Sequence, residues 1–453
     1  MAQAESPDLD RLRVVFEEHK VSKVKLGGFD VDGILRGKYV SLDKFFSAAQ
    51  GGLGFCNVLF GWDIQDQLYD NAQVTGWHSG YPDAVATVDL STFRMIPWEP
   101  GTAAFLLDFN DREGRPLPYS PRQVLQRVVA RAARAQLRAR LAAEYEFFFF
   151  KETAESARAK GYCGLTPLSP GMFGYSWLRA SESKELTHEI QDELAAFDLQ
   201  IEGFHTETGP GVFEAAIAAD AGVRAADKAA LFKTAVKEIA HRHGLMPCFM
   251  AKWNEKLPGC SGHIHLSLWH GQKNVFSDGA GGMSGQMEQA IAGQLALLPE
   301  LTAVVAPTIN SYKRMVEGAW APTSASWGLD NRTTALRAIT GSATSTRIEH
   351  RQVAADMNPY LAMAAVLGAA LWGIEKGMSP PPPVRGNAYA VQGAPRLPGT
   401  LAEATVRLRG SAAAREILGE GFVEHFARTR EWEVRQFERA VTSWELERYL
   451  EAI

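Results

Sequence analysis

Three short segments of the sequence alternate polar and apolar residues, and their polar residues are unusual choices for a solvent-exposed strand. They read Glu144-Tyr-Glu146, His263-Ile-His265-Leu-Ser267 and Arg347-Ile-Glu349-His-Arg351. Because strand side chains point alternately to opposite faces, each segment would present its polar residues on one face. Ordinary solvated strand faces are the alternative. The four phenylalanines after Glu146 weaken that alternative, because they favour a doubly buried strand in which an unpaired carboxylate is costly.

A fourth segment, His205-Thr-Glu207-Thr-Gly-Pro-Gly-Val-Phe-Glu214, adds two carboxylates around a Gly-Pro-Gly turn. Its glycines allow backbone and ligand to approach closely. Together the segments supply five carboxylates and an imidazole, a set of ligands that suits Mg²⁺ or Mn²⁺ better than a thiolate-selected metal. Carboxylates gathered this densely would repel one another unless cations neutralised them. We therefore expect a divalent metal site.

Arginines supply the opposite charge within a short part of the chain: Arg314, Arg332, Arg337, Arg347 and Arg351. Their planar guanidiniums can bind carboxylate and phosphate through two parallel hydrogen bonds. Metals held by acids, facing arginines, suit phosphoryl transfer between anions. No Walker A sequence is present, so the sequence excludes a P-loop enzyme.

The composition narrows the class of protein. Hydrophobic residues make up 46% of the 453 residues and charged residues 22%, which is typical of a soluble globular protein. A net charge of −5 gives no electrostatic footprint for nucleic acid. The four cysteines are far apart, the first seven residues lack the order of a signal peptide, and no apolar stretch is long enough to span a membrane. We expect a cytoplasmic protein that binds neither nucleic acid nor membrane.

The pattern along the chain changes near residue 112, within Asp111-Arg-Glu-Gly-Arg. Residues 21–110 have the alternation of strands, and strand-like segments and helices follow one another after the boundary. Periodicity predicts helices over residues 123–140, 224–243, 284–297, 360–376 and 420–450. The sequence thus predicts a small N-terminal domain, residues 1–112, and a large domain, residues 113–453.

These motifs, in this order, resemble the glutamine synthetase superfamily over essentially the whole chain. Further matches are Asn310-Ser-Tyr-Lys-Arg314, Asn331-Arg332 with Arg337, and Asn358-Pro-Tyr360. The resemblance implies an α+β fold, with a β-grasp-like N-terminal domain and a catalytic domain whose curved antiparallel sheet is surrounded by helices. It also implies a homo-dodecamer of two stacked hexameric rings, with active sites between neighbouring subunits.

The resemblance assigns roles to residues. It implies two or three Mg²⁺ or Mn²⁺ ions, held by Glu146, Glu207 and Glu214 at one site and by Glu144, His263 and Glu349 at another. The amino-acid substrate would contact Arg314, Arg351 and Gly259. ATP would be the co-substrate, on the side of His265, Ser267 and Arg347, with Arg332 and Arg337 at its phosphates. Arg332, Arg351, Asp63 and Trp320 would act in catalysis, Asp63 from a loop, residues 60–63, that closes a neighbour's site.

One departure from the family pattern bears on the substrate. Ammonia-using members carry glutamate in a Gly-Tyr-Glu-Ala-Pro loop, whereas this chain reads Gly318-Ala-Trp-Ala-Pro322. Trp320 cannot accept a proton, but its ring can stack on an alkyl or aromatic amine. Val212 and Pro258 also replace residues that are typical of ammonia-using members.

We interpret the chain as an ATP-dependent ligase that forms a γ-glutamyl amide from glutamate and a primary amine through a γ-glutamyl phosphate. The alternatives are an ammonia-using glutamine synthetase, in which another group replaces the missing carboxylate, and a catalytically silent structural or sensory relative. For Trp320 itself, the alternative is that it only fills space.

Overall fold

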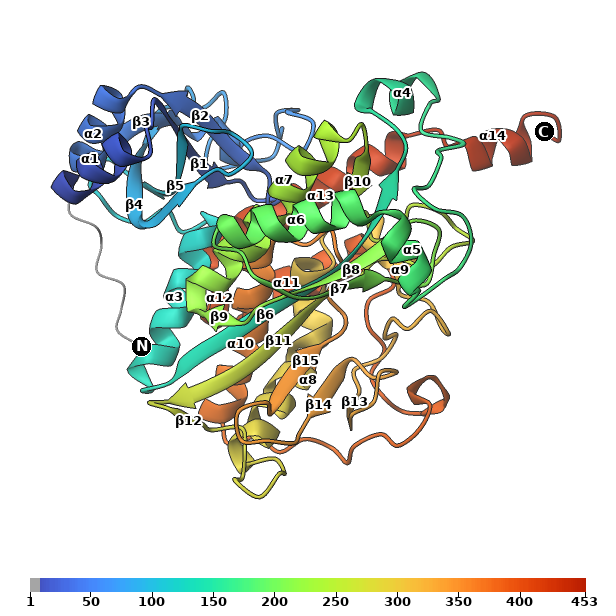
Figure 1. Ribbon diagram of the computed structural model, residues 1–453. Helices are drawn as coiled ribbons and strands as arrows, with labels where there is room; N and C mark the ends of the chain where they lie inside the picture. Colours follow the sequence, from blue (N-terminus) through green and yellow to red (C-terminus); the bar gives the residue numbers. More distant parts are fainter. Residues whose placement is uncertain (1–8) are drawn as a thin grey trace.

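A small five-stranded sheet is built from the N-terminal part of the chain (Figure 1). The computed structural model describes residues 9–453. The strand order is β2-β1-β5-β4-β3, with β1 parallel to β5 and the other neighbours antiparallel. The strands are β1 (Lys23–Phe29), β2 (Leu35–Val40), β3 (Leu53–Cys56), β4 (Asp83–Met95) and β5 (Thr102–Asn110). Helices α1 (Leu9–Glu18) and α2 (Leu42–Gly51) accompany it, and Phe45 of α2 stacks on Phe105 with ring centroids 4.6 Å apart.

A larger, curled sheet of ten strands follows, with the main order β13-β14-β15-β11-β6-β8-β7. Its strands are β6 (Arg138–Phe150), β7 (Ile201–Thr206), β8 (Val212–Ile217), β9 (Asp220–Ala221), β10 (Met246–Cys248), β11 (Gly262–His270), β12 (Lys273–Asn274), β13 (Trp327–Leu329), β14 (Leu336–Ile339) and β15 (Arg347–His350). All of its pairings are antiparallel except β13 with β14. The predicted α+β fold with a curved sheet is confirmed.

The two faces of the larger sheet differ as the residue alternation predicts. Tyr145 of β6 stacks on Phe232 of helix α7 (Gly222–Arg242), with ring centroids 5.6 Å apart. Ile264 and Leu266 of β11 are likewise buried. One face of the sheet therefore packs on helices, and Glu144, the neighbour of Tyr145, points to the other face.

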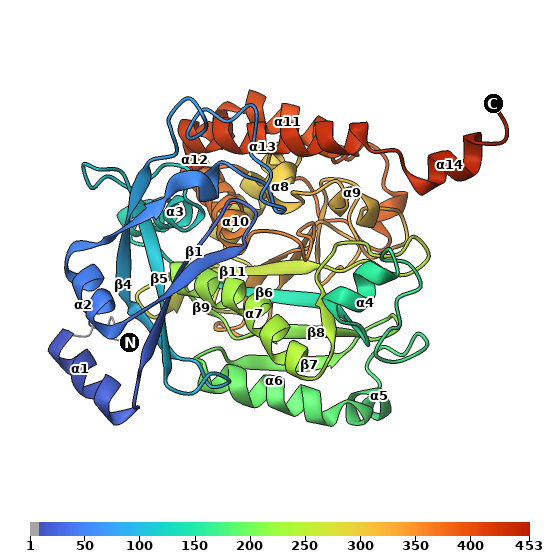
Figure 2. The same ribbon diagram turned by 90° about the horizontal axis from the view of Figure 1, so that it is seen from above.

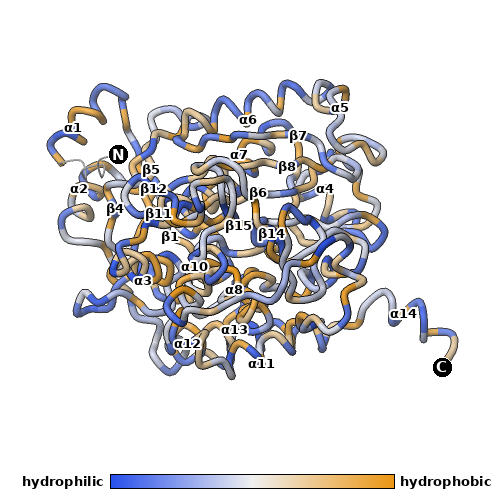
Figure 3. Tube along the Cα trace, turned by 90° about the horizontal axis from the view of Figure 1, so that it is seen from below, coloured by the Kyte–Doolittle hydropathy of each residue, from blue (hydrophilic) through white to orange (hydrophobic). Residues whose placement is uncertain are grey.

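The remaining helices surround the sheet (Figures 1 and 2). They are α3 (Pro121–Arg134), α4 (Ala154–Ala159), α5 (Trp177–Glu182), α6 (Lys184–Ala196), α8 (Gly285–Val305), α9 (Ser311–Arg314), α10 (Pro359–Glu375), α11 (Leu401–Gly410), α12 (Ala412–Leu418), α13 (Glu420–Arg439) and α14 (Ser443–Tyr449), with short 3-10 turns at Asn57–Phe60 and Ala388–Ala390. Helices α8 and α10 make close contact where a Cβ on Gly293 would lie 2.6 Å from Gly373 Cα. The tube of α8 is mostly hydrophobic in colour (Figure 3).

Three predicted helices have different limits in the structure. The helix predicted over residues 123–140 ends at Arg134, because Gln136 adopts a left-handed φ of 58° and the chain then enters β6. The helix predicted over residues 420–450 is two helices, with Thr442 capping the second through a capping box. Helix α8 continues beyond the predicted end, through Pro299 to Val305.

Arg122 of α3 joins the small sheet to helix α7, which packs on the larger sheet. Its guanidinium lies 2.7 Å from Asp89 of β4, 2.9 Å from Asp108 of β5 and 2.8 Å from Asp227 of α7. The domain boundary predicted near residue 112 falls between β5 and α3 and stays a prediction. The first residues, which carry the expectation about a signal peptide, lie outside the described part. No helix of the described residues is long and apolar enough to cross a membrane.

Candidate active site

Strand register gathers the predicted polar residues on one face of the larger sheet. Strand β6 lies between β11 and β8, and β15 pairs with the far side of β11. The cross-strand pairs are Glu144 with His263, Glu146 with Glu214, His265 with Glu349, and Arg337 with Glu349. Paired residues on adjacent strands point to the same face, so segments up to 200 residues apart form one charged surface.

Four of these residues form a tight cluster. Ligand atoms of Glu144, His265 and Glu349 all lie within 4.8 Å of one another, and the described residues contain no other trio as close. His263 Nδ1 lies 3.5 Å from Glu144 and 3.3 Å from Glu349. His263 is buried, and its Nε2 has no protein partner. The structure thus brings together the predicted trio, Glu144, His263 and Glu349, and adds His265 as a second imidazole.

The charges of this cluster favour a cation. Burial acts to raise the pKa of Glu144, but hydrogen bonds with His263 and His265 outweigh it and hold that pKa below its usual range. Burial likewise opposes ionisation of Glu349, whereas His263 and Arg351 lower its pKa to about 2. Burial and the charge of Arg351 lower the pKa of His263, which favours the neutral imidazole that can bind a metal.

The second predicted trio is more open. Glu146 accepts a hydrogen bond from the Ser261 backbone, and Glu207 accepts one from the Thr208 backbone at 2.7 Å. Burial raises the pKa of Glu214 to about 8; a hydrogen bond with His205 opposes this, and the charges of Glu144 and Glu146 add to it. Glu146, Glu207 and Glu214 do not converge to the distances of the first cluster, but their mutual repulsion fits carboxylates that share a cation.

The predicted substrate arginines are buried beside this surface. Arg314 donates to the backbone carbonyls of Gln352, at 3.2 Å, and Arg351, at 3.3 Å. Arg351 donates to Glu349 and, from Nε, to the Arg332 carbonyl at 3.1 Å. Gly259 packs directly on Arg314, because a Cβ there would lie 2.8 Å from Arg314 Cγ. A side chain at Gly259 would therefore displace the arginine.

The residues predicted on the ATP side lie around His265. Arg347 Nε lies 3.2 Å from His265 Nδ1, and His265 Nε2 lies 3.2 Å from Glu144. Arg337 donates to Glu349 at 2.9 Å and also contacts Asp330. Ser267, on the same strand as His265, accepts a hydrogen bond from Trp269 at 2.9 Å.

Trp320 lies at a cavity of about 660 Å³ that Arg332 also lines. The indole is 64% exposed, and its backbone has a left-handed φ of 56° two residues after Gly318, whose φ is 79°. Leu329, Pro383 and Val384 supply apolar walls. Trp320 and Arg332, which are both predicted to act in catalysis, thus lie at one opening.

Asp63 lies elsewhere in this chain. Its carboxylate accepts hydrogen bonds from the backbone of Gln65 and Gln67, at 2.8 and 2.9 Å, and from Trp432 Nε1 of α13 at 3.0 Å. It has no described contact with the metal-ligand candidates of its own subunit.

Two aromatic residues beside the second trio were not singled out from the sequence. The Tyr175 ring stacks on His205 at a centroid distance of 4.3 Å, and His205 Nε2 lies 3.2 Å from Glu214. Burial and the charge of Glu207, which accepts its hydrogen bond, raise the pKa of Tyr175 to about 12. Tyr175 lies in an irregular loop, so no periodicity marked it. His205 alternates with Glu207, and this was its only signal.

Known proteins match the chain over nearly its whole length. Residues 118–449 match the family described as glutamine synthetase, catalytic domain. The type-1 glutamine synthetase 2 of Dictyostelium discoideum is 48% identical, over 97% of this chain and 86% of its own length. The glutamate–isopropylamine ligase of a Pseudomonas species is 38% identical over the full length of both chains.

Two further matches agree. The γ-glutamylethanolamide synthetase GlnA4 of Streptomyces coelicolor is 38% identical, over 98% of this chain and 96% of its own length. A solved structure of a GmaS/ADP complex superposes with a TM-score of 0.85 at 28% identity, covering 97% of this chain and 99% of that one.

The curved sheet, its gathered carboxylates, imidazoles and guanidiniums, and these relatives define a carbon–nitrogen ligase. The chain belongs to the glutamine synthetase family, whose members use ATP and divalent metal ions. The resemblance inferred from the sequence motifs is confirmed.

Proposed function

We propose that this chain joins glutamate to a primary amine other than ammonia, using ATP and passing through a γ-glutamyl phosphate. The observation that carries the proposal is Trp320, which stands where ammonia-using members have a glutamate and lines a cavity together with Arg332. Relatives that are named as ligases of isopropylamine and ethanolamine, each 38% identical to the chain, support it.

Divalent ions would be held by Glu144, His263 and Glu349 and by Glu146, Glu207 and Glu214, and when bound they would offset negative charge on phosphate oxygens. The donor atoms, the unpartnered Nε2 of His263 and the raised pKa of Glu214 fit such ions. We propose Mg²⁺ or Mn²⁺ because oxygen ligands predominate.

The arginines bind and orient the two anionic substrates. Arg314 and Arg351 would pair with a carboxylate of glutamate. The phosphates of ATP would pair with Arg332, Arg337 and Arg347. A γ-carboxylate oxygen of glutamate attacks the terminal phosphorus of ATP, and ADP leaves. The amine nitrogen then attacks the acyl carbon, loses a proton and expels phosphate, leaving the amide. Guanidiniums fixed by backbone carbonyls and Glu349 need little reorganisation during these steps.

The cavity at Trp320 favours a monoamine over a polyamine. Asp330 is the one acidic residue among those that line it, and Arg337 already pairs with that carboxylate. Arg332 and Arg385 add positive charge, which would repel a second ammonium group. Trp320, Leu329 and Val384 instead offer apolar contact to a short alkyl or aryl group. We therefore propose an acceptor with a single amino group and an uncharged remainder.

The direct test measures ADP release with glutamate and each of isopropylamine, ethanolamine, putrescine and ammonia. We expect the highest kcat/KM with one of the two uncharged-tail monoamines. If ammonia were the best acceptor by a wide margin, the chain would be a glutamine synthetase, the function named for its 48% identical relative. If no amine supported ADP release and ATP with Mg²⁺ failed to raise the melting temperature, the silent alternative would hold.

We further propose that the chain assembles into a dodecamer of two hexameric rings in the cytoplasm. Helix α14 supports assembly, since it projects from the body of the chain (Figure 2) with Trp444, Leu446 and Leu450 exposed. Large apolar side chains exposed together on a projecting helix indicate a partner surface. Asp63, which contacts α13 rather than the metal-ligand candidates of its own chain, fits a role in a neighbour's site.

A further inference from the structure

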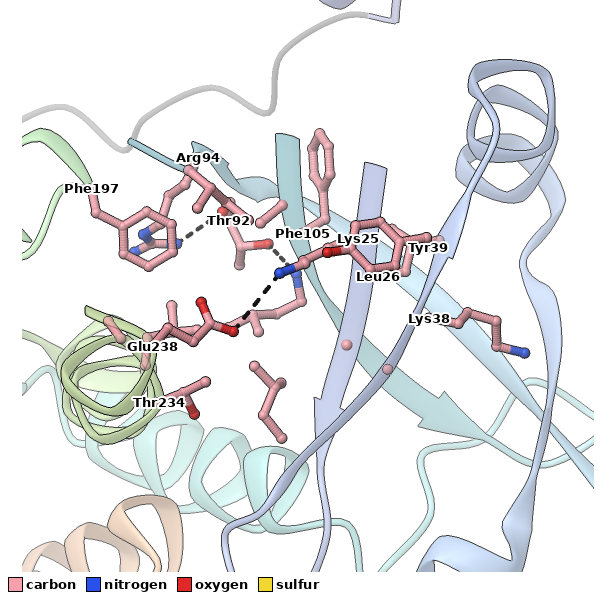
Figure 4. Close-up of a pocket in the computed structure, with 18 of the residues that line it drawn as sticks. Lys25, Leu26, Lys38, Tyr39, Thr92, Arg94, Phe105, Phe197, Thr234 and Glu238 are labelled. Carbon is pink, nitrogen blue, oxygen red and sulfur yellow. Dashed lines mark hydrogen bonds and ion pairs between the residues drawn. The ribbon is translucent and has the colours of Figure 1, made fainter. Parts of the chain in front are cut away.

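A second cavity, of about 240 Å³, lies between the small sheet and helix α7 (Figure 4). Strands β1, β2, β4 and β5 contribute to its walls, and the described residues that line it include no member of the metal cluster. Gly27 and Gly37, which are directly paired across β1 and β2, form part of one wall. The two strands approach closely there, because a Cβ on Gly37 would lie 2.5 Å from the Leu26 carbonyl oxygen.

Most of the lining is apolar. Leu106 contributes from the small sheet, and Leu231 and Ala235 from α7. These side chains belong to the buried core, so a hydrocarbon group in the cavity would be removed from water on several sides.

Arg94 is the exception in this lining. Its side chain is only 4% exposed, and burial lowers its pKa. One terminal nitrogen donates to the Thr92 carbonyl at 2.8 Å, and another lies 3.4 Å from Asp198, a half-exposed carboxylate that also pairs with Arg224 at 3.0 Å. Arg94 Nε is buried and has no protein partner. The guanidinium therefore keeps an unused donor, and its described ion pair is the one with Asp198, which Arg224 shares.

The other charged groups of the lining are already paired or point away. Lys25 lies 2.6 Å from Glu99 and 3.8 Å from Glu238, and Glu238 accepts a hydrogen bond from Trp98 at 2.7 Å. Lys38 points away from the centre of the cavity (Figure 4). The cavity thus combines an apolar interior with one incompletely compensated cation at the end beside Phe197.

We propose that this cavity is a second ligand site, which binds a small carboxylate with an apolar body. The carboxylate accepts a hydrogen bond from Arg94, and the hydrocarbon lies against Leu106, Leu231 and Ala235. A carboxylate would stabilise the buried guanidinium more than water does. A highly charged ligand such as a nucleotide is excluded, because its charges would be costly to bury against apolar walls. The site is independent of the proposed ligase reaction, because binding there needs no metal and no ATP.

Calorimetric titration of the full-length protein with phenylacetate tests the proposal. Excess glutamate in both solutions keeps the probe from Arg314 and Arg351. We expect binding that weakens about tenfold in Arg94→Met, which keeps the apolar stem but removes the charged donor. The uncharged isostere phenylacetamide should bind weaker than phenylacetate by a similar factor.

Two further variants keep the result interpretable. Arg224→Met removes the other arginine on Asp198 without touching the cavity lining, and its affinity for phenylacetate should match that of the wild type. Thr234→Leu, on α7, fills the cavity without altering Arg94 and should weaken binding even if Arg94→Met folds poorly. Absence of phenylacetate binding, equal affinity for phenylacetamide, unchanged affinity in Thr234→Leu, or an equal loss in Arg224→Met would each overturn the proposal.

Discussion

In the proposed reaction, Trp320 would decide which nucleophile the acyl intermediate meets. A glutamate at this position can bind an ammonium ion and accept its proton, whereas an indole can do neither and instead offers an aromatic face. In the structure the indole is largely exposed at the mouth of a cavity, so a substrate can reach it without displacing core residues.

Trp320→Glu is expected to shift the preference of the enzyme towards ammonia. The new carboxylate would attract ammonium. Asp330 is the acidic residue of the lining that could repel this carboxylate, and Arg337 neutralises it. A change of about tenfold or more in the ratio of kcat/KM for ammonia to that for isopropylamine is expected from one charge contact. Trp320→Phe is the control, because it keeps an aromatic face. Unchanged ratios in Trp320→Glu would mean that Trp320 only fills space.

His263→Asn is expected to reduce ADP release by about 100-fold or more, because the cluster loses one of its nitrogen ligands. The fold should remain, since no described protein group depends on His263 Nε2. The decisive readout is the rise in melting temperature on adding Mn²⁺, which should shrink in the variant. His270→Asn, an exposed change on the same strand, should behave like the wild type. An undiminished Mn²⁺ effect in His263→Asn would remove this residue from the metal site.

Helix α7 carries a partly buried lysine against the back of the sheet. Lys233 donates to the backbone carbonyls of Ala355, at 2.9 Å, and Met357, at 3.2 Å, just after the strand that bears Glu349. Burial and the neighbouring Lys237 lower the pKa of Lys233 to about 7. The ammonium thus satisfies two carbonyls, but its charge is poorly solvated.

The lowered pKa of Lys233 predicts that the free energy of unfolding depends on pH. Between about pH 7 and 10.5 the unfolded chain binds more protons at this residue than the folded chain, so its contribution to stability rises with pH. Relative to Lys233→Met, the free energy of unfolding of the wild type should rise by on the order of 4 kcal/mol at most across that window. The difference between the two proteins should level off below pH 7. Denaturant unfolding of both proteins at several pH values measures it. A difference that stays constant from pH 7 to 10 would contradict the assignment.

At the scale of the whole molecule, Arg122 is an ionic connection between the small sheet and helix α7, which packs on the larger sheet. It joins Asp89 and Asp108 of the small sheet to Asp227 of α7, and Tyr360 of α10 also donates to Asp227 at 2.7 Å. Arg122→Met should cost about 3–5 kcal/mol, because three carboxylates would lose their shared cation. Arg127→Met, on the same helix, removes contacts to two backbone carbonyls only and should cost less. Equal losses of melting temperature in both variants would show that Arg122 has no special role.

Helix α14 tests the proposed assembly. Deletion of residues 441–453 removes the exposed apolar helix without touching a buried side chain. We expect the truncated chain to keep its fold and to form smaller assemblies than the full chain in light scattering coupled to gel filtration. An unchanged molar mass would place the subunit contacts elsewhere.

The sequence by itself determined which polar residue types are present and how they alternate along the strands. Period-two spacing placed Glu144 with Glu146 and His263 with His265 on common strand faces, because side-chain direction in a strand is a local property. Segment ends were less certain, since the left-handed turn at Gln136 and the cap at Thr442 depend on single residues. These stop the helices predicted over residues 123–140 and 420–450.

Only the tertiary structure decided which residues meet. Strand register set Glu144 opposite His263 and His265 opposite Glu349, and this pairing of distant segments follows from packing rather than from spacing along the chain. The tertiary structure also revealed Tyr175 over His205, the incompletely compensated Arg94, and a Trp320 cavity without a free carboxylate. The residue types indicated a metal-dependent ligase. The shape and charge around Trp320, which arise from three separate chain segments, favour a small monoamine as its acceptor.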